Sequence, residues 1–105
     1  MSYMYGDPEK FGLTTVGEID WSSGSYEFDL TVVWQRKFDG VFVYGEDSGC
    51  SCPAPFESTG VDELTQITSL ESFKQHLAER RRDGYYDRSD EVARLLERLH
   101  GLGLR

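Results

Sequence analysis

The chain has 105 residues, 38% of them hydrophobic, and a formal net charge of −8. This length is typical of one domain, whose core buries about two-thirds of the surface that the unfolded chain exposes. Six Phe, six Tyr and two Trp argue against an intrinsically disordered acidic chain, because disordered segments contain few aromatic residues.

Targeting and redox features of the sequence favour the cytoplasm. Residues 1–12 lack the basic and apolar parts of a signal peptide, and the sequence has no apolar run of about 18 residues that could span a membrane. The only cysteines are Cys50 and Cys52, so a disulfide framework is excluded and reduced thiols are expected. We therefore expect a cytoplasmic protein with no membrane partner.

Charge is distributed unevenly along the chain. Residues 1–65 contain 12 acidic and three basic side chains, a balance of −9. Residues 66–105 contain seven acidic and eight basic side chains, a balance of +1. The N-terminal part of the protein is therefore expected to present an acidic surface.

The first part of the chain is predicted to form a sheet. After an N-terminal arm at residues 1–12, residues 13–44 are predicted to be a three-stranded antiparallel meander. The clearest strand lies between Tyr26 and Gln35, where side chains alternate with the period of two that a half-buried strand shows. Leu13–Asp20 is predicted to precede it, and Asp39-Gly40 favours a hairpin turn into Val41–Tyr44.

A loop and two helices are predicted to follow the sheet. Residues 45–67 form a Cys-Pro loop and connector, because they are rich in Gly and Pro and show no period. Residues 68–101 are predicted to be a helical hairpin with a tail at 102–105. Thr68 and Glu71 have the spacing of a capping box, Ser89 is expected to be the second N-cap, and Gly101 is expected to end the second helix. The fold class is α+β in a single domain.

The Cys50 and Cys52 pair suggests a metal site. Residues two apart in an extended segment face the same side, so both thiolates could approach one ion. A tetrahedral zinc site needs two more ligands, and the candidates are His76, His100 and Asp47. The alternative is that both thiols only order the loop. Because the sequence also lacks a recognisable nucleophile motif or phosphate-binding loop, we predict a non-enzymatic protein with no catalytic residue and no cofactor.

The second half contains the only concentration of basic side chains. Arginines and tyrosines together resemble the charge and stacking groups that bind nucleic acids. Interleaved acidic residues indicate ion pairs within the helices instead, and the net charge of −8 would repel phosphate. Nucleic-acid binding is therefore a secondary hypothesis, and its residues are Arg80, Arg81, Arg82, Tyr85, Tyr86 and Arg88.

The acidic half favours binding to a protein. Clustered surface charge accelerates encounter with an oppositely charged partner, and an acidic surface can also mimic a nucleic acid. A homodimer that buries an exposed sheet face or edge is a further expectation, because three strands and two helices make a thin core. The predicted protein-binding residues lie on the central strand and the loop: Tyr26, Phe28, Asp29, Trp34, Asp47 and Phe56.

Two stretches of the sequence resemble a known group of proteins. One is Tyr26-Glu27-Phe28-Asp29 leading to Val33-Trp34, and the other is the loop from Asp47 to Glu57 with the pattern D-S-G-C-S-C-P-x-P-F-E. Together they resemble small uncharacterised proteins of actinobacterial tailed phages, over about half of the chain. The resemblance implies a phage accessory protein made inside a bacterial cell, with a host or phage protein as its partner, and it implies no catalytic residue.

Overall fold

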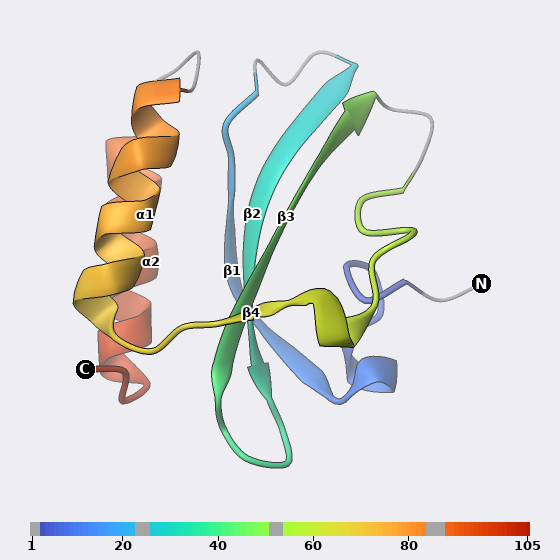
Figure 1. The fold of residues 1–105 in the computed structure, drawn as a ribbon, viewed down its shortest axis with the longest axis horizontal. Helices are drawn as coiled ribbons and strands as arrows, with labels where there is room; N and C mark the ends of the chain where they lie inside the picture. The colour runs from blue at the N-terminus through green and yellow to red at the C-terminus, as the bar shows by residue number, and fades with distance from the viewer. Residues whose placement is uncertain (1–2, 23–25, 51–53, 84–87) are drawn as a thin grey trace.

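The structure is a computed structural model and describes residues 3–22, 26–50, 54–83 and 88–105. It confirms the α+β class, with an antiparallel sheet beside two helices (Figure 1). The elements in chain order are the 3-10 helix η1 (Pro8–Phe11), β1 (Leu13–Asp20), β2 (Glu27–Arg36), β3 (Phe42–Cys50), the 3-10 helix η2 (Val61–Glu63), β4 (Thr65–Gln66), α1 (Leu70–Asp83) and α2 (Ser89–Gly101).

The sheet has the strand order β1-β2-β3-β4, so the predicted three-stranded meander lacked one strand. In the fourth strand, Thr65 pairs with Tyr44 and Gln66 pairs with Val43. A strand of two exposed residues is too short to produce a hydrophobic period, and its signal is therefore absent from the sequence. The predicted loop also begins too early, because β3 continues past Tyr44 to Cys50 and pairs with β2 along its whole length.

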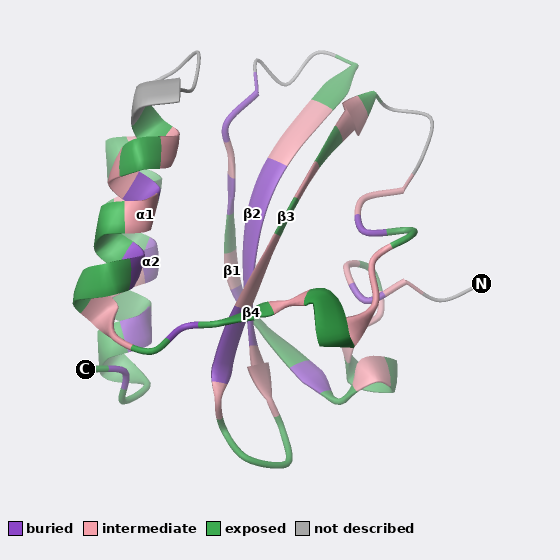
Figure 2. Cartoon of the chain, viewed as in Figure 1, coloured by how far each residue is buried: buried purple, intermediate pink, exposed green. Residues whose placement is uncertain are grey.

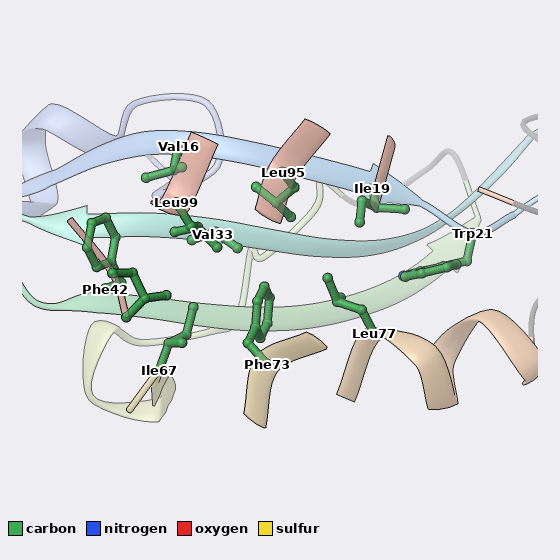
Figure 3. Close-up of a cluster of buried hydrophobic side chains, with 11 residues drawn as sticks. Val16, Ile19, Trp21, Val33, Phe42, Ile67, Phe73, Leu77, Leu95 and Leu99 are labelled. Carbon is green, nitrogen blue, oxygen red and sulfur yellow. The ribbon is translucent and has the colours of Figure 1, made fainter. Parts of the chain in front are cut away.

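Helices α1 and α2 cover one face of the sheet, which we call the helix face (Figure 1). Val33 of β2, Leu77 of α1 and Leu99 of α2 have no exposed surface and meet in one cluster of apolar side chains (Figure 3). Trp21, which follows β1, lies in the same cluster. The apolar side chains of both helices therefore pack against the sheet.

The chain itself covers the opposite face of the sheet, which we call the loop face. Met4 of the N-terminal arm and Phe56 of the segment at 54–64 pack there against Trp34 of β2, and all three are buried. Figure 2 shows buried stretches in both of these segments and along β2. The Phe56 ring meets the Trp34 ring edge-on, with 5.2 Å between the ring centroids. Phe56 adopts a φ of 62°, a left-handed conformation that is unfavourable for a bulky residue and is offset here by its burial.

Both helix starts differ from their predicted caps: α2 has Arg88 at its N-cap, and Ser89 is its first helical residue, whereas α2 ends at Gly101 as predicted. The Ser69 hydroxyl accepts the Ser72 N–H at 3.1 Å, so Ser69 rather than Thr68 caps α1. At the end of α2, the Leu104 N–H donates to the Leu99 carbonyl at 3.0 Å, and Gly103 has a φ of 109°. Gly103 therefore supplies the left-handed residue of a Schellman motif, and this turn places Leu104 in the helix-face cluster.

Candidate functional site

An ion-pair network connects α1 to the middle of the sheet. Arg80 Nη2 of α1 lies 2.6 Å from Asp29 Oδ1 of β2, and Arg80 Nε lies 2.9 Å from Glu46 Oε2 of β3. Thr31, which is fully buried, donates its hydroxyl to Glu46 Oε2 at 2.6 Å and accepts the Trp21 indole N–H at 2.9 Å. The contact of Arg80 Nε lacks hydrogen-bond geometry and is electrostatic. The Arg80 guanidinium therefore neutralises a carboxylate on each of two strands and holds α1 against the sheet.

Aromatic rings lie beside Glu46 in this network. His76 Nε2 lies 3.1 Å from Glu46 Oε2, and the His76 ring contacts Tyr44 with 4.9 Å between centroids. Burial and the charge of Glu46 raise the pKa of Tyr44, whereas the hydrogen bond with the Thr65 side chain acts in the opposite direction. A hollow of about 160 Å³ lies between these side chains, Phe73 and β4.

The loop face has a second hollow, of about 220 Å³, beside the end of β3. Phe28, Asp47 and Glu57 line it together with Ser48. Asp47 holds this region together, because its Oδ1 accepts the Ser48 N–H at 3.0 Å and its Oδ2 accepts the Phe56 N–H at 2.7 Å. The Asp47 carboxylate therefore fixes the segment at 54–64 against β3 and so determines the shape of the hollow.

A third polar feature joins β1, β2 and the start of α2. Asp20 Oδ1 accepts hydrogen bonds from the Ser22 N–H, the Ser22 hydroxyl and the Asp29 N–H. Burial alone would raise the pKa of Asp20, but these bonds and the positive charge of Arg88 lower it overall. Arg88 also donates to the Ser22 carbonyl at 2.8 Å, which ties α2 to the sheet.

The structure brings together some of the predicted protein-binding residues and separates others. Phe28 and Asp47 line the loop-face hollow, and Asp29 is paired with Arg80. Tyr26, with 86% of its surface exposed, precedes β2. By contrast, the side chains of Trp34 and Phe56 are buried in the loop-face cluster. Neither can contact a partner at the surface, which corrects the prediction made from the sequence. Both are apolar residues that hold the surface in place.

The predicted metal ligands lie in different parts of the protein. Cys50 is exposed at the end of β3, His76 faces Glu46, and His100 is exposed on α2. Asp47 is already bonded to two backbone N–H groups. Cys52 is outside the residues that the structure describes, and no group of three or more metal-ligating side chains occurs among those it does describe. The metal hypothesis stays a prediction.

The arginines predicted for a nucleic-acid site are also dispersed. Arg80 and Arg88 contact the sheet and the strand connection, and Arg81 is exposed on α1. The side chain of Arg82 and the whole of Tyr85 and Tyr86 are outside the described residues. Two of the six predicted contacts are therefore occupied within the chain. The described parts also include no helix with the length and apolar character needed to cross a membrane.

A family model for a domain of unknown function, DUF7574, matches residues 2–101. The chain belongs to this family. The match includes the sheet, the loop and both helices, so the DUF7574 domain extends beyond the half of the chain in which the phage resemblance lies. No curated protein and no solved structure matches the chain.

Two parts of this DUF7574 domain were missed from the sequence. Glu46 was assigned to a loop, although Tyr44, Glu46 and Ser48 continue the alternate spacing of β3 on the helix face. Glu57 follows Phe56 and reaches the hollow only because Asp47 fixes this segment. Glu46 lies among Gly, Asp and Ser residues with no apolar period and is placed by pairing with β2, whereas Glu57 is placed by the contact between Asp47 and Phe56.

Proposed function

We propose that this protein is a non-enzymatic accessory protein that binds a host or phage protein through an acidic sheet and loop surface. One observation carries the proposal. Asp47, Glu57, Asp62 and Glu63, at the end of β3 and in the segment at 54–64, have no ion pair with a basic side chain among the described residues. Unneutralised carboxylates on one surface attract a basic partner and accelerate its encounter.

Three other acidic residues of the same half are paired with basic side chains close by, unlike the residues of this group. Asp39 is bound by Arg36, with 2.8 Å between Oδ2 and Nη2. Glu9 is paired with Lys37, and Asp7 with Lys10. The sequence resemblance to phage proteins supports a bacterial cell as the place of binding and a bacterial or phage protein as the partner.

A pair of charge reversals tests the proposal. Glu57→Lys with Asp62→Lys changes two exposed carboxylates of the acidic surface. Glu79→Lys with Glu97→Lys is the matched control, because it changes two exposed helical carboxylates and shifts the net charge equally. Each protein is used as bait in an actinobacterial lysate, and the captured proteins are quantified by mass spectrometry.

We expect the wild-type and control baits to capture at least one protein equally. Capture of the same protein by the Glu57→Lys, Asp62→Lys bait should fall about tenfold, which corresponds to about 1.4 kcal/mol of binding free energy. Purified partner and bait should then show the same difference by titration. If the two pairs of substitutions reduce capture equally for every protein, the acidic surface has no specific role and the proposal is wrong.

A further inference from the structure

The outer edge of β3 is only partly occupied. All nine residues of β3 pair with β2, but only Val43 and Tyr44 pair with β4. Figure 1 shows β4 beside only part of the longer β3 strand. The register would place Glu63 opposite Glu46, but Glu63 belongs to the 3-10 helix η2, so β4 begins after that position. From Glu46 onward, β3 has no further strand beside it among the described residues.

Backbone groups on this part of β3 point outward. The Arg36 N–H donates to the Val41 carbonyl, and the Ile67 N–H donates to the Phe42 carbonyl. Because antiparallel pairs alternate between bonded and non-bonded positions, odd-numbered residues of β3 bond to β2 and even-numbered residues face the outer edge. The backbone N–H and C=O of Glu46, and the C=O of Ser48, are therefore available to another strand.

The two hollows lie on opposite faces of this edge. An added strand would place successive side chains alternately on the helix face and the loop face. On the helix face its residue opposite Glu46 would adjoin the hollow that β4, Tyr44 and His76 border. On the loop face it would meet the hollow that contains Asp47 and Glu57. An open edge with a hollow for each alternate side chain is the arrangement that peptide-binding sheets use.

Charge determines which partner fits this edge. The loop-face hollow contains two carboxylates, and Asp62 and Glu63 follow in the same segment. A second copy of this chain would bring another set of the same carboxylates to the edge, and like charges would repel. A segment with basic side chains on alternate residues would instead neutralise them.

We propose that the β3 edge from Glu46 to Ser48 binds an extended basic segment of another protein as an added antiparallel strand. The inference deepens the proposed function and rests on it, because it specifies how the partner binds. In this arrangement a partner residue opposite Glu46 exchanges two backbone hydrogen bonds with it and directs its side chain to the helix face. The next partner residue directs a basic side chain toward Asp47 and Glu57.

A capped peptide of alternating lysine and valine is the probe, with an alternating glutamate and valine peptide as its charge control. In the proposed register the valines bond to β3 and the lysines direct their N–H groups to solvent. N-methylation of the valines should therefore weaken binding at least about tenfold, by loss of backbone hydrogen bonds, whereas N-methylation of the lysines should leave it within about twofold. Amide exchange of Glu46, followed by NMR, should slow on binding.

Ser48→Pro tests the same edge in the protein, because the proline ring blocks the outer edge and removes no bond to β2, although it does remove the Ser48 N–H bond to Asp47 Oδ1. We expect it to fold, to lose the peptide and to lose the partner captured by wild type. If Ser48→Pro does not fold, the comparison between the two N-methylated peptides tests strand addition on its own. Equal binding of these two peptides, stronger binding of the glutamate peptide, or a wild-type dimer that Ser48→Pro converts to monomer would each overturn the inference. Capture that survives Ser48→Pro but not Glu57→Lys, Asp62→Lys would overturn strand addition and leave the proposed function standing.

Discussion

At the scale of single residues, carboxylates determine much of the local structure. Asp20 and Asp47 each accept hydrogen bonds both from a residue close by in the sequence and from a residue nine positions away. A carboxylate can accept more than two such bonds, and bonds to a charged acceptor are stronger than bonds between neutral groups. One acidic residue can therefore fix the course of a loop that has no regular secondary structure.

Asp20 gives a prediction about acid stability. Its pKa is lowered overall, because hydrogen bonds from Ser22 and Asp29 and the charge of Arg88 outweigh the effect of burial. A carboxyl with a lower pKa in the folded state stabilises the protein above its unfolded pKa, about 3.9, and loses this contribution as pH falls through the folded value. Asp20→Asn should therefore reduce the free energy of unfolding by roughly 1 kcal/mol at neutral pH.

Urea unfolding at a series of pH values measures this effect. The difference between wild type and Asp20→Asn should be constant from neutral pH down to about pH 5 and should shrink below about pH 4. Glu97→Gln, at an exposed position of α2, is the control and should show a much smaller difference at every pH. A difference for Asp20→Asn that grows on acidification would contradict the assigned direction of the pKa shift.

At the scale of elements, the sequence predicted the parts with a strong period. Leu13–Asp20 was predicted with its observed bounds, and the central strand and both helices were predicted to within about two residues. The second half of β3 was not predicted, because Gly45 and Gly49 favour a loop when only composition is considered. It becomes a strand because each of its residues pairs with β2, and such pairing depends on the tertiary fold.

The candidate site was predicted less completely for the same reason. Phe28 and Asp47 were placed on the surface, and they do line one hollow. Phe56 was predicted to contact a partner, but its position above Trp34 depends on the Asp47 carboxylate, which no local pattern reveals. Arg80 belonged to a run of three arginines in the sequence, and only the fold shows that it faces the sheet.

Arg80 gives a prediction about the contact between α1 and the sheet. Arg80→Met retains the apolar stem but leaves Asp29 and Glu46 without their cation, so the free energy of unfolding should fall by about 1–3 kcal/mol. Adding Asp29→Asn should restore part of the loss, because one uncompensated charge is removed. Arg81→Met, at the exposed neighbouring position, is the control, and an equal effect of both arginine substitutions in chemical denaturation would contradict this role.

At the scale of the whole molecule, one sheet separates two apolar clusters. Val33 belongs to the helix-face cluster, whereas Val32 and Trp34 on either side of it belong to the loop-face cluster. The loop-face cluster is closed by Met4 and Phe56 from two segments without long regular elements. Because adjacent residues of one strand serve both clusters, loss of either cluster should destabilise the other.

The two tryptophans allow this coupling to be measured, since Trp21 lies in the helix-face cluster and Trp34 in the loop-face cluster. Trp21→Phe leaves a fluorophore on the loop face, and Trp34→Phe leaves one on the helix face. Within each variant, the urea transition followed by fluorescence should coincide with the transition followed by circular dichroism, as a two-state domain requires. A Trp34 signal that changes at a lower urea concentration than the circular dichroism would show that the N-terminal arm and the segment at 54–64 unfold as a separate unit. The coupling between the two clusters through β2 would then be weaker than we expect.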